Sequence, residues 1–209
     1  HSTLLDLLNL ASSRKIKVFV VGGTLRDHLL NKNFSDIDLT AINGADLGIQ
    51  FAQSLNFNYV QLDKTPGRAT TRIVFPNNKH FDLTDLQGTR IEEDLEKRDF
   101  TINAMGQELS DFLSDQKHII DPLSGKNDLQ NSLIKFTSPA VFQADPLRML
   151  RAFRFAATMK FTIDKETLTE ISKNKNNFTT VSGERVWQEL INFLEAENTG
   201  NPLNWMHNS

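Results

Sequence analysis

The sequence has no cysteine among its 209 residues, which excludes disulfide bonds and thiolate metal sites. A reducing compartment is compatible with this absence, and we expect a cytoplasmic protein. No apolar run approaches the length needed to span a membrane, and no signal peptide is visible. The net charge of −3 is not that of a general nucleic-acid binder. Any nucleic-acid partner must therefore be held by a local basic stripe or by parts outside this sequence.

Aromatic residues are used unevenly, with fifteen Phe against one Tyr and two Trp. This usage favours aromatic packing over a surface on which bases stack. The hydrophobic share of 39% and the charged share of 23% are typical of a globular protein. A chain of 209 residues is long enough for one large domain or two small ones.

The most informative stretch runs from residue 18 to residue 40. An apolar run over 18–21 predicts a buried strand that stops at Gly22-Gly23, and an amphipathic segment follows over 24–30. A second short strand carries Asp36 and Asp38. Because successive side chains on a strand point to opposite sides, these two carboxylates share one side. They repel each other unless a cation lies between them, and such hard oxygen ligands favour Mg²⁺.

The same stretch also predicts a site for an anion. Glycines allow a ligand close to the backbone, and the N–H groups at the start of the next helix are free to bind it. Arg26 adds a guanidinium whose geometry suits phosphate oxygens. A lone Gly-Gly more often marks a turn, and a lone Asp-x-Asp more often marks a solvated strand end. Together, in one strand–turn–helix–strand unit, they favour a site for a triphosphate and its metal ions.

Further elements are predicted on either side of this unit. The apolar pattern predicts a helix over 3–13 that covers the first strand, a helix over 45–55, and strands over 57–62, 69–75 and 79–83, with a hairpin turn at Asn77-Asn78. Asp82 then falls on an interior strand, where it is either a third metal carboxylate, which we favour, or an exposed edge residue. A helix with an acidic start near residue 92 leads to Arg98, Asp99 and Asn103, and residues 118–129 predict a strand, a turn and a helix.

The character of the chain changes near residue 138. Apolar residues at helical spacing predict helices over 139–159, 164–173 and 183–196, with loops at 162–164 and 174–177. Mixed structure followed by helices predicts two domains, at 1–138 and 139–209.

Three arginines recur every three residues in the first of these helices. Asp145 precedes Pro146, which predicts an N-cap with proline at the first helical position. Arg148, Arg151 and Arg154 form a ridge that slants around the helix, so they do not all reach one small group. We expect Asp145 and Arg148 to lie near a base, and the other two arginines to lie near phosphate or neighbouring backbone.

A carboxylate beside a guanidinium has a definite preference among bases. It matches the amino donor and ring-nitrogen acceptor that cytosine and adenine present, and it mismatches guanine and uracil. Taken alone, however, such a stretch is more often a solvated helix face with a capping Asp.

These residues belong to an ordered series of motifs that spans about residues 18 to 190. The series comprises Val21–Asp27, Asp36–Asp38, Lys97–Ala104, Asp121–Leu129, Asp145–Arg148 with Arg151–Ala156, and Gly183–Val186. In this series the sequence resembles the class II tRNA nucleotidyltransferase and bacterial poly(A) polymerase family of the DNA polymerase β-like superfamily.

The resemblance implies an α+β fold, in which a nucleotidyltransferase head with a mixed sheet is followed by an all-α neck that selects the nucleotide. It also implies roles for matching residues: Asp36 and Asp38 for two Mg²⁺; Gly22, Gly23 and Arg26 for the triphosphate; Arg98, Asp99 and Asn103 for ribose and phosphates; Asp145 and Arg148 for the base, with support from Arg151 and Arg154. From its place on an interior strand, we expect Asp82 to be a further catalytic acid. The implied reaction is attack of a tRNA 3′-hydroxyl on the α-phosphate of CTP or ATP, with release of pyrophosphate.

Two departures from the family pattern narrow this expectation. Ala144 stands where the family usually has Glu, which suggests weaker nucleotide selection or another supporting group. Only residues 87–91 stand where A-adding members hold a longer flexible segment, so we expect an enzyme that adds CC. The alternatives are a full CCA-adding enzyme, a poly(A) polymerase, or a binding module that has lost turnover. The family's C-terminal body and tail are missing after the neck, so we expect poor tRNA affinity.

Overall fold

The computed structural model describes residues 2–34, 36–76 and 79–209. The chain divides into two compact units, one formed by residues 1–96 and 103–122 and the other by residues 97–102 and 123–209. The chain therefore passes from one unit to the other after residues 96, 102 and 122. The domain boundary at 138 stays a prediction, and the division seen here assigns 97–102 and 123–138 to the unit with the C-terminal helices.

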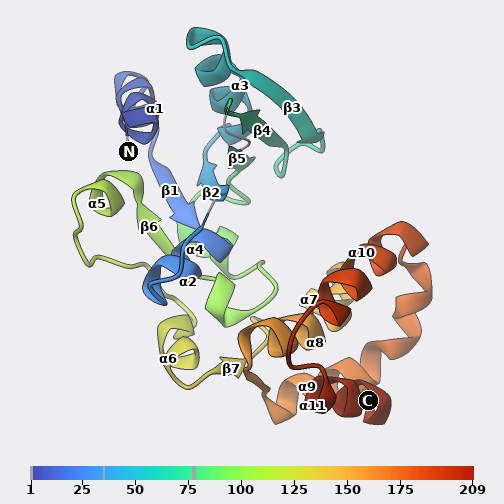
Figure 1. The fold of residues 1–209 in the computed structure, drawn as a ribbon. Helices are drawn as coiled ribbons and strands as arrows, with labels where there is room; N and C mark the ends of the chain where they lie inside the picture. The colour runs from blue at the N-terminus through green and yellow to red at the C-terminus, as the bar shows by residue number, and fades with distance from the viewer. Residues whose placement is uncertain (1, 35, 77–78) are drawn as a thin grey trace. The chain divides into compact units, whose positions relative to one another are not determined.

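The first unit is built on a six-stranded sheet in the order β3-β4-β5-β2-β1-β6 (Figure 1). The strands are β1 Val18–Val21, β2 Asp36–Ala41, β3 Asn58–Asp63, β4 Thr70–Val74, β5 His80–Asp85 and β6 Gly106–Glu108. The pairing of β2 with β5 is parallel and the other pairings are antiparallel, so the predicted mixed sheet is confirmed.

Five helices belong to the first unit in the part of the chain that the structure describes. They are α1 Ser2–Ser13, α2 Gly22–Leu29, α3 Gly44–Ser54, α4 Ile91–Leu95 and α5 Leu109–Leu113. Helix α3 packs on β4 and β5 through Gly48, whose missing side chain would meet Thr71 and Leu83 at 3.3 Å. This close approach buries the apolar residues of that sheet side and leaves the other side to polar side chains.

Most predictions for the first unit are confirmed. The helices over 3–13 and 45–55 and the strands over 57–62, 69–75 and 79–83 correspond to α1, α3, β3, β4 and β5. Residues 77–78 of the expected hairpin turn lie outside the described residues. The strand expected from residue 118 is wrong, since only an isolated bridge from Ile120 to Gly106 forms there. The chain next enters Asp121-Pro122, where proline removes a ladder donor.

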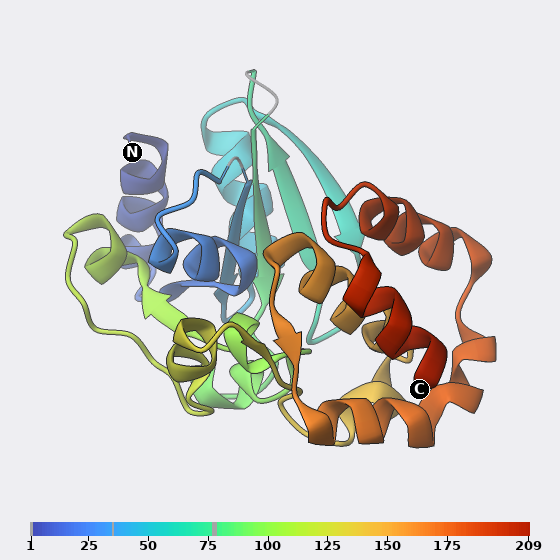
Figure 2. The same ribbon diagram turned by 60° about the horizontal axis from the view of Figure 1, so that its bottom comes forward.

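The second unit consists mainly of helices (Figure 2). Its elements are α6 Gly125–Gln130, β7 Leu133–Ile134, α7 Val141–Ala144, α8 Leu147–Met159, β8 Thr162–Ile163, α9 Lys165–Asn174, the 3₁₀ helix Lys175–Thr180, α10 Gly183–Leu194 and α11 Gly200–Asn208. A further 3₁₀ turn, Thr101–Asn103, lies where the chain returns to the first unit. Helix α8 contacts α7, α10 and α11, and its Phe155 meets Phe100 edge to face at 5.7 Å between ring centres.

Three predictions for the second unit are wrong in detail. The single helix expected over 139–159 is two helices, because the residue before a proline is pushed out of helical geometry and Asp145 has φ −151° and ψ 99°. The expected loop at 162–164 contains β8, which pairs with β7, and the expected loop at 174–177 is mostly a 3₁₀ helix. Helix α11 was not predicted.

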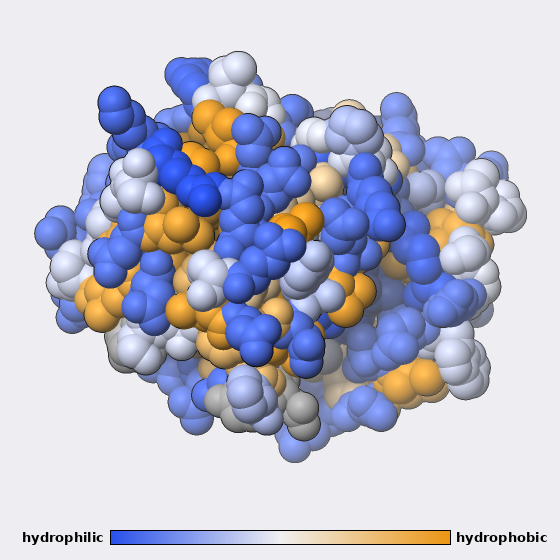
Figure 3. All heavy atoms as spheres, turned by 90° about the horizontal axis from the view of Figure 1, so that it is seen from above, coloured by the Kyte–Doolittle hydropathy of each residue, from blue (hydrophilic) through white to orange (hydrophobic). Residues whose placement is uncertain are grey.

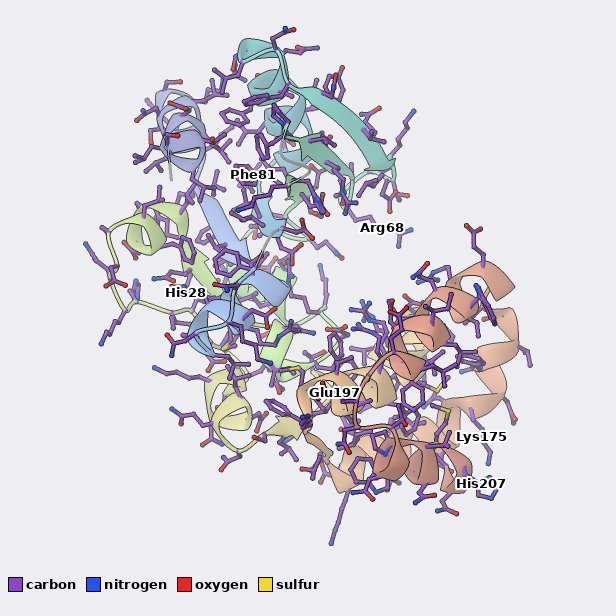
Figure 4. All side chains as sticks on the ribbon, in the orientation of Figure 1. His28, Arg68, Phe81, Lys175, Glu197 and His207 are labelled. Atoms are coloured by element: carbon purple, nitrogen blue, oxygen red, sulfur yellow. The ribbon has the colours of Figure 1, made fainter. Side chains whose placement is uncertain are left out.

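The many phenylalanines pack inside the units, as their abundance predicts. In the first unit Phe81 meets Phe75 at 4.5 Å between ring centres, and Figure 4 shows its side chain inside that unit, away from Arg68. Hydrophobic residues on the face drawn in Figure 3 are dispersed among hydrophilic ones. No helix in the described ranges is long and apolar enough to cross a membrane.

Candidate functional site

A row of acidic residues occupies the sheet side opposite α3. The parallel register pairs Asp38 on β2 with Asp82 on β5, and it pairs Asp36 with His80. Leu39 and Leu83 form the next pair, and their side chains point to the buried side. The alternation that places those leucines under α3 therefore places the three carboxylates together on the other side.

Asp82 and Asp36 have partners on neighbouring strands. Asp82 accepts two hydrogen bonds from the Arg72 guanidinium on β4, at 2.8 and 2.7 Å. His80 Nδ1 lies 2.9 Å from Asp36 Oδ1. The hydrogen bonds that Arg72 donates to Asp82 outweigh burial and raise the pKa of Arg72, and the nearby charges of Asp36 and Asp38 act in the same direction. Arg72 therefore offsets part of the negative charge that the acids concentrate.

The acidic row has the donor chemistry for a divalent cation. Asp36 and Asp38 offer hard oxygen ligands from one side of one strand, and bound phosphates and waters commonly complete such a shell. Among the residues that the structure describes, no group of three or more His, Cys, Asp or Glu is arranged to enclose a metal ion by itself. The role of Asp82 as a further catalytic acid stays a prediction, and its two oxygens are engaged by Arg72.

The helix after β1 begins against these acids. It begins at Gly22, with φ +63°, so the chain turns from strand to helix without a loop and two residues earlier than predicted. A Cβ placed on Gly23 would lie 3.5 Å from both Arg26 Nη2 and Asp38 Oδ2. The structure therefore brings the predicted glycines, arginine and acid together.

Thr24 holds this helix start in place. Its hydroxyl accepts a hydrogen bond from Asp38 N at 2.8 Å and donates one to Asp36 O at 3.2 Å. Arg26 is held by Asp27, which accepts bonds from Nε and Nη2 at 2.9 Å, and by Asn103, which accepts one from Nη1 at 2.8 Å. Asn103 and Arg26, 77 residues apart, are thus neighbours within the first unit.

The second unit contains a chain of ion pairs between two buried carboxylates and two partly buried arginines. Asp99 accepts two hydrogen bonds from Arg151, at 3.0 and 2.7 Å. Glu189 on α10 accepts one from Arg151 at 3.2 Å and one from Arg154 at 2.5 Å. Arg151 and Arg154 are therefore engaged by protein carboxylates, and their predicted nearness to phosphate stays a prediction.

The three arginines of α8 differ in their electrostatic surroundings. Burial alone lowers the pKa of Arg151, but the charges of Asp99 and Glu189 outweigh it and the pKa is raised. Burial lowers the pKa of Arg154, and Glu189 only partly compensates. Burial also lowers the pKa of Arg148, against the attraction of Asp99 and Asp145. All three stay charged at neutral pH, because an arginine side chain does not lose its proton in proteins.

Arg148 differs from its neighbours because its guanidinium makes no hydrogen bond or ion pair within the described part of the chain. Asp145, one turn earlier, accepts a bond from Leu147 N at 3.2 Å and one from Arg185 at 2.8 Å. Helix α8 begins at Leu147 with Pro146 as its N-cap, so the predicted N-cap at Asp145 is one residue early. The Arg98 carbonyl accepts a bond from the Thr137 hydroxyl at 2.6 Å. Arg148 is thus a partly buried cation that is available to a ligand.

Several residues of these clusters were not predicted as site residues. Glu189 lies 35 residues after Arg154 and Arg72 lies 10 residues before Asp82, so no local spacing connects them. The role of Thr24 could have been predicted, because its hydroxyl lies between a double glycine and an arginine, at the point where a strand meets a helix. Arg185 belongs to the motif Gly183–Val186, for which the sequence predicts no site role.

Two family models match parts of this chain. Residues 18–135 match the family model described as the poly(A) polymerase head domain. The chain belongs to the tRNA nucleotidyltransferase and poly(A) polymerase family. Residues 160–208 match a second family model, described as a probable RNA- and SrmB-binding site of polymerase A. The acidic row and the α2 glycines lie within the first match, and α10 lies within the second. Enzymes of such nucleotidyltransferase families generally use divalent metal ions.

Individual family members are similar over most of this chain. A CC-adding tRNA nucleotidyltransferase of Geobacter sulfurreducens is 37% identical over 90% of this chain and 43% of its own length. One from Synechocystis is 35% identical over 84% of this chain and 41% of its own. The solved structure of a Thermotoga maritima CCA-adding enzyme complexed with tRNA superposes with a TM-score of 0.84 at 30% identity, over 98% of this chain and 50% of that one. The chain thus spans about half the length of the relatives it matches.

Proposed function

We propose that this protein is a template-independent nucleotidyltransferase that adds C residues, as CC, to the 3′ end of tRNA. The 3′-hydroxyl oxygen of the RNA forms a bond to the α-phosphorus of CTP. The bond from that phosphorus to the bridging oxygen breaks, pyrophosphate leaves, and the hydroxyl proton passes to solvent. The observation that carries the proposal is the contact of Gly23, Arg26 and Asp38, which gathers groups suited to a triphosphate and to metal at one helix start.

The first unit supplies the phosphate and metal chemistry in this proposal. Asp36 and Asp38 would hold two Mg²⁺, which when bound lower the pKa of the attacking hydroxyl and neutralise charge on the phosphates. Backbone N–H groups at the start of α2 bind phosphate oxygens, since they have no partner within the helix. Arg26 adds positive charge at that place, and Asp27 and Asn103 fix its orientation.

The second unit supplies the choice of nucleotide. Arg148 donates to the acceptor of a cytosine pairing edge, and Asp145 accepts from its amino group. Burial of Arg148 sharpens the choice, because a buried donor left unpaired against the wrong base costs about 1–3 kcal/mol. Arg151 and Arg154, held by Asp99 and Glu189, keep the rest of α8 in position.

The short segment before α4 supports CC addition over the addition of A. It is bonded to α4 at two points: Gln87 N donates to Asp94 at 3.0 Å, and Thr89 N donates to Glu93 at 2.9 Å. A segment so fastened has little of the freedom that the longer segment of A-adding members provides. Both relatives described above are CC-adding enzymes, and the CCA-adding Thermotoga protein keeps full CCA addition as the second candidate.

Nucleotide incorporation tests the proposal. The protein is incubated with Mg²⁺, each labelled triphosphate in turn, and an excess of tRNA that lacks its terminal CCA. We expect two C residues and then a stop. Addition of CCA supports the second candidate, tailing with A alone supports a poly(A) polymerase, and CTP binding without incorporation identifies a binding module.

The acid assignment has its own test. We expect Asp38→Ala to abolish incorporation, because the metal site loses a ligand. The matched control is Asp6→Ala, an exposed acid on α1, which should keep wild-type activity. Wild-type activity in Asp38→Ala would contradict the assignment of the acidic row.

A further inference from the structure

Two residues of α10, one turn apart, bond to arginines of α8 and to the acid that precedes α8. Glu189 holds Arg151 and Arg154, as described above. Arg185, four residues earlier in the first turn of α10, donates from Nη2 to Asp145 Oδ2 at 2.8 Å. The same helix therefore holds both the acid that precedes α8 and the arginines that follow it.

Both oxygens of Asp145 are fixed in this arrangement. Oδ1 accepts from Leu147 N at 3.2 Å, while Oδ2 accepts from Arg185. An ionised carboxylate has about four acceptor positions, so two remain for a ligand. Because the two bonds involve different oxygens, they fix the rotation of the carboxylate plane as well as its place. Arg185 thus orients Asp145 without using up its acceptor capacity.

No other charged group that the structure describes is bonded to this carboxylate. Residue 144, immediately before it, is an alanine with no polar side chain to offer. Arg148 lies close enough for its charge to act on Asp145, but its guanidinium makes no bond to it. Without Arg185, Asp145 would be held only by the backbone bond at Leu147, about which its carboxylate is free to rotate.

We propose that Arg185 is a positioning residue that sets nucleotide specificity by aiming Asp145 at the amino group of the incoming base. The inference rests on the proposed function and deepens it. Bases that present an amino donor, cytosine above all, bind more tightly when the carboxylate is oriented to accept from that amino group. Guanine and uracil present no amino donor at that position, so they gain nothing from it. Arg185 therefore affects affinity for one class of triphosphate and not for the others.

The test compares Arg185→Gln and Arg185→Lys with a matched control. Arg68→Gln is the control, since Arg68 is an exposed arginine that also pairs with an aspartate, Asp63 at 3.2 Å. Binding of CTP, ATP, GTP and UTP is measured by calorimetry, and kcat and KM for CTP are measured by incorporation. Thermal unfolding verifies that every variant is folded.

We expect Arg185→Gln to raise Kd and KM for CTP about 2- to 5-fold, the range for a partly exposed ion pair that acts on a ligand contact. kcat should change little, and binding of GTP and UTP should stay as in the wild type. Arg185→Lys should restore part of the loss, and Arg68→Gln should have no effect.

Three outcomes would overturn the proposal: unchanged CTP binding in Arg185→Gln, an equal loss for all four triphosphates, or tighter CTP binding. The last would mean that Arg185 blocks Asp145. An unfolded Arg185→Gln together with a folded, fully active Arg185→Met would overturn it as well. A wild-type protein that binds no triphosphate would instead refute the proposed function, and this inference with it.

Discussion

Glu189 is the residue whose removal should destabilise the second unit most selectively. Its two oxygens serve two arginines, and its side chain is only 10% exposed. Glu189→Ala leaves Arg154 without its carboxylate and leaves Arg151 with Asp99 alone. Removing one partner of a buried ion pair typically costs about 3–5 kcal/mol, because the other charge stays buried and unpaired.

The structure places this case below the upper end of that range. The Arg151 side chain is 32% exposed and keeps two hydrogen bonds to Asp99, so losing its bond to Glu189 costs little stability. Arg154 is 16% exposed and also lies over the Phe155 ring, at 4.1 Å, which retains some favourable contact for its charge. We therefore expect Glu189→Ala to lower the free energy of unfolding by about 2–3 kcal/mol.

Thermal unfolding provides the measurement. For a chain of this size a loss of 1 kcal/mol lowers Tm by about 2–4 °C, so Glu189→Ala should lower it by about 4–12 °C. Gln188→Ala is the control, because this neighbouring exposed residue makes only a weak bond to Asn192, and it should shift Tm by about 1 °C or less. If Glu189→Ala unfolds at the temperature of the control, the ion-pair network does not stabilise the unit and the reasoning fails.

Two smaller predictions concern the first unit. Gly44→Ala should lower the free energy of unfolding by about 1–3 kcal/mol in a denaturant titration, because its Cβ would lie 2.2 Å from the Thr84 carbonyl oxygen. The control is Gly183→Ala, which has open space around it and should change the free energy of unfolding little. Equal effects of the two substitutions would contradict the close approach at Gly44. Hydrogen bonds from Thr89 lower the pKa of Glu93, so its stabilising effect should be complete above the carboxyl's ordinary pKa and lost as the pH falls through the lowered value. The difference in Tm between wild type and Glu93→Gln should shrink in acid, and a difference that grows there would contradict this assignment.

Patterns of period two and of helical period were enough to predict most of the first unit. Alternation placed Asp36 and Asp38 on one side of a strand, and the apolar run at 18–21 together with the double glycine predicted the strand-to-helix turn. That Asp82 lies beside Asp38 depends on a parallel pairing between strands more than 40 residues apart, which no local pattern reveals. The sequence nevertheless placed Asp82 on an interior strand.

The residues that escaped prediction depend on partners distant in the chain. The arginine ridge of α8 was visible, but which arginine is free is decided by Asp99 and Glu189, on other segments. The short elements β6, α5, β7 and β8 carry too few residues for a period to be recognised. Pro146 was predicted at the first helical position and lies one residue before α8, and its effect in dividing 139–159 into two helices was not predicted.

The three passages of the chain between its two units have a consequence for dissection. Asp99 lies in residues 97–102, a six-residue segment of the second unit. Its partner Arg151 comes later in the chain, after residues 103–122 have returned to the first unit and the chain has entered the second unit again. No single cut in the chain separates the two units completely. A cut at 138 would leave residues 97–102 on the N-terminal fragment, so Arg151 would lose Asp99. Each unit is built from two separate segments of the chain, so the two units should be expressed together as one polypeptide.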